Sequence, residues 1–412
     1  MSAPRSPYTR AIWYEGMRLD PKINNVISER SEKRHNALRA KMAMGYSGKE
    51  NPLLEKSIDN RIQDMINLIR KKYISEGTQY RPLDFAVIAQ YFTMDVLTDV
   101  AFGEPFGYLK NDKDMYDYIK TIRGFMPVLE LQTNSPLTNY IMSSRVVKAL
   151  LAPTAKDLTG MGPVIRIAQE VVRERFGPNK IEREDMLGSF VRHGLTQQEA
   201  ESESLLQIMA GADSTATAIR STLLYIISHP RVYNKLQAEI DEAERNGAIS
   251  NPITNNEAKN LPYLQAVIKE GLRIFPPLTG LMTKLVPPEG DTINGQFIPG
   301  GTEIGYNAWG THHRKETFGE DAILFRPERW LEADPDQLRA MENSNELVFG
   351  SGRYKCLGHP VAHIELNKTF LQLLRTFDFQ LADPIKPFST RCNGIHIQQF
   401  MWVRVSERVK AK

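Results

Sequence analysis

The chain has few cysteines, no long apolar stretch and almost no excess of charge. Two cysteines in 412 residues argue against a disulfide framework and for a reducing compartment. No run of about eighteen apolar residues occurs, so we expect no transmembrane segment in the chain as given. The first residues, M-S-A-P-R-S-P-Y, also lack the apolar core of a signal peptide. The net charge of +3 argues against nucleic-acid binding.

What the chain does contain is enough apolar content for a large core. Hydrophobic residues make up 41% of the sequence. No internal repeat, low-complexity segment or long Gly/Ser linker divides it. We therefore expect a single domain over residues 1–412.

The most specific stretch surrounds one cysteine. Residues 349–358 read F-G-S-G-R-Y-K-C-L-G, so Gly350, Gly352 and Gly358 surround Cys356. Glycine accepts positive φ and lets the backbone approach a flat ligand without a Cβ in the way. An amphipathic run follows Pro360, which predicts that Cys356 lies at a helix N-terminus. There the helix dipole favours the thiolate, which is the form that ligates a metal.

A lone cysteine is more often a small buried hydrophobe than a ligand. Here, however, Phe349 precedes the sulfur and the basic residues Arg353 and Lys355 flank it. This combination suits a cofactor that carries both an iron and acidic substituents, and a thiolate-ligated haem fits that description.

A second stretch lies within a long helix predicted over about 197–229. Ala210, Gly211 and Ala212 form a notch of small residues, followed by Asp213, Ser214 and Thr215. Glycine costs ~1 kcal/mol relative to alanine inside a helix, so Gly211 needs a reason. The notch either packs against another helix or accepts a ligand, and the cysteine loop favours the ligand.

Charged pairs and strand signals occur elsewhere along the chain. His35 and Arg39 lie one turn apart on a basic helix, and Glu270 and Arg273 lie at i and i+3 on another. Either pair alone reads as a solvated helix face. Helices are also predicted over 53–74 and 84–102. Short strands are predicted around Lys284, at 292–298 with the hairpin dipeptide Asn294-Gly295, and at 302–309.

Together these stretches resemble the cytochrome P-450 superfamily of haem-thiolate monooxygenases. The cysteine loop, the A-G-A-D-S-T segment, the Glu-x-x-Arg pair and the segment F-R-P-E-R-W at 325–330 occur in the family's order. The stretch Tyr8–Glu55 is similar to the fungal branch around pisatin demethylase. The resemblance implies a mainly α fold with a small β-sheet, without the family's N-terminal anchor, first helix and first strands.

The resemblance also implies roles for individual residues. Cys356 is the axial ligand of the haem iron, and Asp213, Ser214 and Thr215 relay protons. Glu270, Arg273 and Arg329 lock the cysteine loop. The family's basic residue two positions before the cysteine is replaced by Tyr354, so the propionate contact at this position falls to a neighbour. The remaining haem contacts implied are Phe349, Gly350, Gly352, Gly358, Ala210, Gly211, His35, Arg39, Lys284, Arg353 and Lys355.

The implied activity is insertion of one oxygen atom of O2 into a hydrophobic small molecule, by hydroxylation or oxidative demethylation, in fungal secondary metabolism. It uses haem b, with electrons from NADPH through NADPH-cytochrome P-450 reductase, on the cytosolic face of the endoplasmic reticulum. A reductase-independent haem-thiolate isomerase or dehydratase and a non-catalytic haem-binding protein are the alternatives.

Family members normally carry an anchor, a hinge, a helix and strands ahead of the region matched here. Membrane association would come only through that missing anchor. We therefore expect the strands around Thr292–Tyr306 to present an unpaired edge with exposed apolar side chains. We expect either a longer natural chain or weak folding of the 412-residue form.

Overall fold

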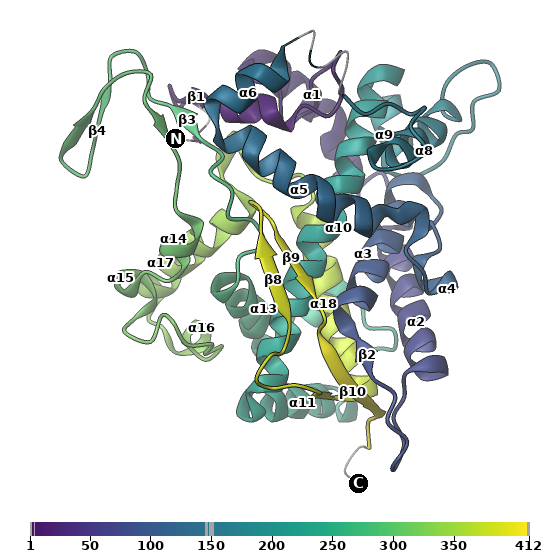
Figure 1. Ribbon diagram of the computed structural model, residues 1–412. Helices are drawn as coiled ribbons and strands as arrows, with labels where there is room; N and C mark the ends of the chain where they lie inside the picture. Colours follow the sequence, from purple (N-terminus) through teal and green to yellow (C-terminus); the bar gives the residue numbers. More distant parts are fainter. Residues whose placement is uncertain (1, 4, 145–146, 148–151, 410–412) are drawn as a thin grey trace.

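Helices make up most of the molecule (Figure 1). The structure is a computed structural model that describes the chain except residues 1, 4, 145–146, 148–151 and 410–412. The α-helices are α1 (Glu32–Tyr46), α2 (Leu54–Lys72), α3 (Phe85–Phe102), α4 (Tyr108–Asn111), α5 (Tyr118–Asn134), α6 (Pro136–Ser143), α8 (Met161–Arg173), α9 (Met186–Arg192), α10 (Gln197–Ser228), α11 (Pro230–Arg245), α12 (Asn255–Lys259), α13 (Pro262–Ile274), α14 (Ala308–His312), α15 (Lys315–Phe318), α16 (Arg329–Glu332), α17 (Pro335–Asn345) and α18 (His359–Thr376). Short 3-10 helices are η1 (Ile12–Met17), η2 (Met115–Asp117), η3 (Glu346–Phe349) and η4 (Gly352–Tyr354).

The described strands form small antiparallel sheets. Two sheets have three strands, in the orders β1-β3-β6 and β2-β10-β7, and two are hairpins, β4-β5 and β8-β9. The strands are β1 (Thr9–Arg10), β2 (Leu83–Asp84), β3 (Lys284–Leu285), β4 (Asp291–Ile293), β5 (Gln296–Ile298), β6 (Glu303–Ile304), β7 (Phe377–Leu381), β8 (Ser389–Cys392), β9 (His396–Gln399) and β10 (Trp402–Glu407). The prediction of a mainly α fold with little sheet is confirmed.

Helix α10 runs through the middle of the molecule and packs against α3, α8, α13 and α18 (Figure 1). Its start is fixed by a capping box in which the Thr196 side chain accepts from the Glu199 N–H and the Glu199 carboxylate accepts from the Thr196 N–H. The contact with α13 is especially close. A Cβ on Gly271 of α13 would lie 2.1 Å from Oγ1 of Thr222 on α10, so only glycine fits between these helices.

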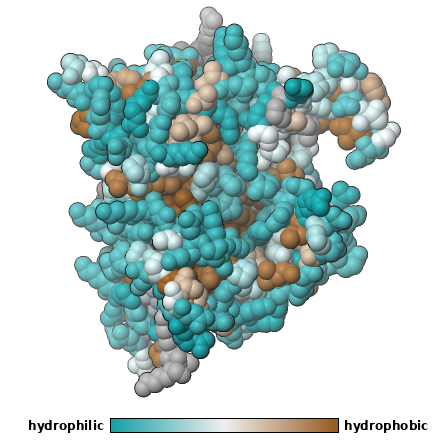
Figure 2. All heavy atoms as spheres, turned by 180° about the vertical axis from the view of Figure 1, so that it is seen from behind, coloured by the Kyte–Doolittle hydropathy of each residue, from teal (hydrophilic) through white to brown (hydrophobic). Residues whose placement is uncertain are grey.

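The hairpin β4-β5 projects from the body of the molecule at the upper left of Figure 1 and the upper right of the rear view in Figure 2. Its turn has positive φ at both Asn294 (52°) and Gly295 (80°), as the Asn-Gly signal predicts. The two strands pair only with each other among the described strands, and Phe297 is 62% exposed. The expected unpaired edge therefore lies here. Strand β6, in contrast, pairs with β3, which pairs with β1.

Helix α3 is the one described helix that is long and apolar enough to cross a membrane. Of its eighteen residues, Phe85–Phe102, 83% are buried inside the protein. It packs against α10 and α2, as a core helix does. The helix ends at Gly103, whose φ of 82° closes it with a left-handed turn, in agreement with the helix predicted over 84–102.

Near its N-terminus α10 carries a buried carboxyl group, that of Glu203. This residue is 2% exposed, and its Oε1 accepts a hydrogen bond from the Val26 N–H at 2.6 Å. Burial raises the pKa of Glu203 to about 8, and the nearby Glu199 carboxylate adds to the rise. The folded protein therefore keeps a proton here at neutral pH that the unfolded chain releases.

We predict that Glu203→Gln stabilises the protein in a pH-dependent way. Between the ordinary glutamate pKa of 4.5 and about 8, wild-type stability falls as the pH rises, because the native state binds the extra proton. Glutamine keeps the acceptor for Val26 but never ionises. The gain in unfolding free energy should be near zero at pH 4.5 and approach ~3–5 kcal/mol above pH 8. Urea unfolding at pH 5 and 9 measures it. Glu201→Gln, at a partly exposed position of the same helix, is the control, and an equal gain at both pH values would refute the assignment.

Candidate functional site

The cysteine loop joins η3 to α18 and is closed by its own backbone. The Cys356 N–H donates to the Phe349 carbonyl at 2.7 Å. Gly350 and Gly352 have positive φ, 70° and 57°, whereas Gly358 has an ordinary φ of −75°. A Cβ on Gly352 would lie 2.0 Å from the Ser2 carbonyl oxygen. Besides its turn geometry, Gly352 therefore makes room for the N-terminal segment.

The Cys356 side chain is exposed and lies just ahead of α18. It borders a cavity of about 210 Å³ lined by Arg39, Ala43, Tyr46, Ser47, Lys355, Cys356, Leu357, His359 and Pro360. Surrounding protein raises the pKa of the thiol, and the backbone N–H groups of Gly358 and His359 and the charges of Arg39 and Lys355 lower it in part. The N–H groups at the start of α18 favour the thiolate, as expected, but desolvation of the sulfur opposes them and the net shift of the pKa is upward. A bound metal reverses that balance, since it binds the deprotonated sulfur.

Cationic side chains gather around Tyr354, and we call Arg10, His35, Lys284, Arg353 and Tyr354 the Tyr354 cluster. The Lys284 ammonium lies 3.6 Å from the centre of the Tyr354 ring, and the Arg10 guanidinium carbon lies 4.5 Å from it. Lys284 also donates to the Tyr14 hydroxyl at 2.8 Å. The His35 ring lies 5.2 Å from the same tyrosine. These groups come from β1, α1, β3 and η4.

The Tyr354 cluster carries more positive charge than its acidic partner balances. Glu32 accepts from Arg353 Nη1 at 2.8 Å and from the Tyr354 hydroxyl. Burial, followed by the charge of Arg10, lowers the pKa of Lys284 to about 7. The buried Nε atoms of Arg10 and Arg353 have no hydrogen-bond partner among the described residues. Such unmatched donors fit a ligand with two carboxylates, as the propionates of haem are.

The predicted pair on α1, His35 and Arg39, is divided between the Tyr354 cluster and the cavity beside Cys356. His35 is 1% exposed in the Tyr354 cluster, and burial lowers its pKa to about 4, so the ring is neutral at pH 7. Arg39, one turn later, lines the cavity beside Cys356. Lys355 of the loop forms an ion pair with Glu346 of η3, with 2.6 Å between the ammonium nitrogen and the carboxylate oxygen.

On α10 the small residues do not all face the same way. Ala210 is exposed although the helix is central, and Ser214, one turn later on the same face, is partly exposed. A Cβ on Gly211 would lie 2.9 Å from a methyl group of Leu97 on α3, so Gly211 serves the packing of two helices. The Ser214 and Thr215 hydroxyls donate to the carbonyls of Ala210 (2.8 Å) and Gly211 (3.2 Å). Thr215 itself is buried.

Asp213 points into the protein, away from the partly exposed face. It is 7% exposed, and its Oδ2 lies 3.0 Å from the hydroxyl of Tyr118, the first residue of α5. Burial raises the pKa of the Asp213 carboxyl, and the positive charge of Arg220 opposes that rise. The hydrogen bonds that the structure describes do not join Asp213 directly to Ser214 or Thr215.

Two residues of the site were missed by reasoning from the sequence. Tyr118 lies in a stretch of mixed composition without a motif. Arg10 lies in a short polar segment near the N-terminus, but β1 pairs with β3 in a register that sets Arg10 opposite Lys284. Recognising that strand pairing is the signal that would have brought the two cations together.

The carboxylate of Glu270 is fully buried and surrounded by donors. Arg273 binds it with two hydrogen bonds of 2.9 and 2.8 Å, and Arg329 donates from Nε at 3.0 Å. The Trp330 indole and the Arg326 N–H complete the set at 2.9 and 2.8 Å. The remaining donors of Arg273 and Arg329 bind carbonyls and one carboxylate within residues 312–324.

Helix α13 connects the Glu270 network to the helix that precedes the cysteine loop. The network fixes residues 312–330 to α13. The Lys269 ammonium of α13 pairs with Glu342 of α17 at 2.6 Å, and the Asn345 amide donates to the Lys269 carbonyl at 3.3 Å. Helix α17 leads directly into η3 and the loop.

Comparisons with known proteins cover nearly the whole chain. The family model described as Cytochrome P450 matches residues 5–400. Cytochrome P450 monooxygenase ABA1 of Pyricularia oryzae is 45% identical over 99% of this chain and 81% of its own length. Cytochrome P450 monooxygenase aba1 of Botryotinia fuckeliana is 42% identical over 99% of this chain and 80% of its own length. The crystal structure of the cytochrome P450DA heme domain has the same fold, with a TM-score of 0.76 over 98% of this chain and 84% of that chain at 16% identity.

We predict that Glu270→Ala abolishes haem loading or folding. It leaves the guanidinium groups of Arg273 and Arg329 buried without their shared acceptor, at a cost of ~3–5 kcal/mol. Glu316→Ala is the control, because its pair with Arg314 is exposed, lies outside the Glu270 network and contributes little to stability. The ratio of Soret to protein absorbance in the purified variants measures loading. Full loading of Glu270→Ala would show that the network is not needed.

Proposed function

This chain belongs to the cytochrome P450 family, and from that membership we propose that it inserts one oxygen atom of O2 into a hydrophobic small molecule in fungal secondary metabolism. The family implies haem b as the cofactor and NADPH as the electron source through a reductase. Hydroxylation and oxidative demethylation are the two reactions proposed. One observation carries the proposal. The structure has both an accessible Cys356 sulfur and, in the Tyr354 cluster, more positive charge than nearby acids neutralise.

Each group of residues has a task toward the cofactor. Cys356 would supply the thiolate ligand of the haem iron. Lys284 and the two arginines of the Tyr354 cluster would hold the propionates, which offer acceptors for the Nε atoms of Arg10 and Arg353 that have none among the described residues. When bound, the haem supplies the reductive activation of O2, and the protein contributes binding, orientation and proton supply.

Proton supply falls to α10 in this proposal. Ser214 shares the partly exposed face with Ala210, whereas Thr215 is buried. We therefore assign Ser214 as the main relay hydroxyl and Thr215 as a secondary one. Asp213 provides the proton, because its buried carboxyl holds one more readily than an exposed aspartate does.

We assign the substrate side to the segment Leu278–Met282. Leu278 and Leu281 are 39% and 47% exposed, so they present apolar surface. The N–H groups of Thr279 and Gly280 both donate to the Gly394 carbonyl, at 2.8 and 3.0 Å, which fixes the segment to the β8-β9 hairpin. An apolar surface held by backbone hydrogen bonds favours a hydrophobic substrate in a defined orientation.

The electron donor is NADPH-cytochrome P450 reductase in this proposal, on the cytosolic face of the endoplasmic reticulum. Its docking face would include Lys355 and the basic helix α1, beside the cavity that Cys356 borders. Basic side chains here complement an acidic partner and bring the electron in on the sulfur side.

The function is tested with the reduced carbon monoxide complex and with oxygen uptake. We predict the strongly red-shifted Soret band that a thiolate ligand gives, and its loss in Cys356→Ala. Cys392→Ala is the control, because it removes the other free thiol at a position away from the cysteine loop. The Cys392 sulfur lies 3.0 Å from the Thr279 hydroxyl oxygen. NADPH-dependent oxygen uptake should require added reductase. Turnover without reductase or NADPH would instead indicate an isomerase or dehydratase, and a colourless protein would indicate no haem at all.

We predict that Ser214→Ala diverts electrons to hydrogen peroxide. Reduction itself should continue, because the hydroxyl handles protons and not electrons. Peroxide formed per NADPH oxidised should rise several-fold in Ser214→Ala and less in Thr215→Ala, which tests the assignment from exposure. A larger effect in Thr215→Ala would reverse the order of the two hydroxyls. Unchanged coupling in the double variant would rule out both.

A further inference from the structure

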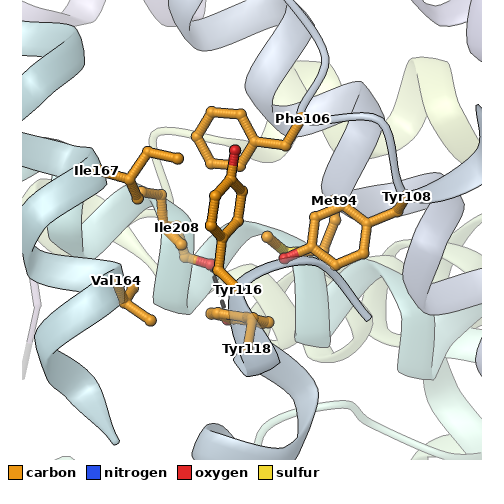
Figure 3. Close-up of a pocket in the computed structure, with 8 residues that line it drawn as sticks. All are labelled: Met94, Phe106, Tyr108, Tyr116, Tyr118, Val164, Ile167 and Ile208. Atoms are coloured by element: carbon orange, nitrogen blue, oxygen red, sulfur yellow. Dashed lines mark hydrogen bonds between the residues drawn. The ribbon is translucent and has the colours of Figure 1, made fainter. Parts of the chain in front are cut away.

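Tyr118 holds its hydroxyl between two acceptors on α10. The residue is 1% exposed. Its hydroxyl oxygen lies 2.9 Å from the Ile208 carbonyl oxygen and 3.0 Å from Oδ2 of Asp213. Figure 3 shows the ring in the wall of a cavity of about 10 Å³, with the hydrogen bond to Ile208 drawn as a dashed line. The cavity is lined by Met94, Phe106, Tyr108, Tyr116, Tyr118, Val164, Ile167 and Ile208.

A phenol has one hydrogen, so it donates fully to only one of these two oxygens at a time. The Ile208 carbonyl has no hydrogen to offer. When the phenol donates to Ile208, the short contact with Asp213 is attractive only if the carboxyl group is protonated and donates to the phenol oxygen. When the phenol donates to Asp213, that carboxyl group is an anion. The geometry therefore has one hydrogen arrangement for each charge state of Asp213.

The charged groups around Asp213 leave Tyr118 as its direct partner. Arg220 on α10 directs its guanidinium elsewhere, with Nε donating to the Ala86 carbonyl at 2.8 Å and Nη2 to Gln90 Oε1 at 2.7 Å. Its charge, that of Arg123 on α5 and the Gln90 amide of α3 lower the pKa of Asp213, but burial raises it more. Burial and Asp213 together raise the pKa of Tyr118, so the phenol keeps its hydrogen.

We propose that the Tyr118 hydroxyl turns between Ile208 and Asp213 and thereby lets Asp213 release and regain a proton. With the proton on Asp213, the carboxyl O–H donates to the Tyr118 oxygen and the phenol donates to Ile208. When that O–H bond breaks, its proton passes to a water molecule that carries it toward the hydroxyl groups of α10, because the hydrogen bonds that the structure describes do not join Asp213 to them directly. The phenol then turns to donate to the new carboxylate. A proton from solvent later restores the acid, and no electron moves. The inference rests on the proposed relay role of Asp213 and makes Tyr118 a positioning residue.

Infrared spectroscopy of the haem-loaded protein tests this directly. The C=O stretching band of a protonated carboxyl group, assigned by its absence in Asp213→Asn, should persist in wild type above the pH where an ordinary aspartate ionises. Tyr118→Phe keeps the ring packing and removes the hydroxyl. In this variant the Asp213 band should move to higher frequency. The pH at which it disappears should rise by about one unit or more, because the Asp213 carboxylate loses its hydrogen-bond donor. Tyr108→Phe is the matched control, since that hydroxyl, at the same cavity, donates to the Met115 carbonyl at 2.9 Å.

The outcomes separate this inference from the proposed function. An unchanged band in Tyr118→Phe, or an Asp213 that ionises like an exposed aspartate in wild type, would overturn the inference and leave the oxygenase activity standing. The expected band shift together with unchanged peroxide formation in Tyr118→Phe would also overturn it, because the pairing would then have no part in proton supply. The band shift with a several-fold rise in peroxide, and neither change in Tyr108→Phe, supports it.

Discussion

The energetic cost of removing charge from water governs this molecule more than any other single constraint. At Glu270 the loss of hydration is compensated by hydrogen bonds, because Arg273, Arg329, Trp330 and a backbone N–H all donate to its carboxylate. Removing Glu270 would leave the guanidinium groups of Arg273 and Arg329 buried without their shared acceptor. That completeness makes α13 and residues 312–330 one unit, and the helix that leads to the cysteine loop starts from this unit. We therefore expect the position of one sulfur atom to depend on a carboxylate elsewhere in the core.

At two other places buried charged groups lack full compensation, and both places lie among the candidate site residues. At the Tyr354 cluster, cations exceed acids, and buried Nε atoms lack acceptors among the described residues. At Asp213, a buried acid has a phenol as its direct partner in place of a cation. Fully matched charges give rigidity, whereas unmatched charges give affinity for an anion or for a proton. The fold separates these uses, with rigidity around α13 and reactivity along α10 and the loop.

Much of the fold could be predicted from the sequence, because the signals were local. The helices predicted over about 197–229 and 84–102 agree closely with α10 and α3. The long-range partners could not be predicted in the same way. Nothing near Tyr118 shows that its hydroxyl reaches α10, and Arg10 acquires its meaning only from a strand register with Lys284. Gly211 illustrates the reverse case, since a motif position contacts Leu97 of a neighbouring helix. The motif gives the residue type, and only the packing gives the direction of the side chain.

The contact between Gly271 and Thr222 has a consequence for motion. With no side chain between them, α13 and this part of α10 have no room to slide past each other, and a packed contact of this kind resists compression. These two helices therefore move as one body. An opening that admits a bulky molecule therefore costs less on the other sides of α10 than between α10 and α13. In mechanical terms, the contact between these two helices is a fixed support for the rest of the molecule.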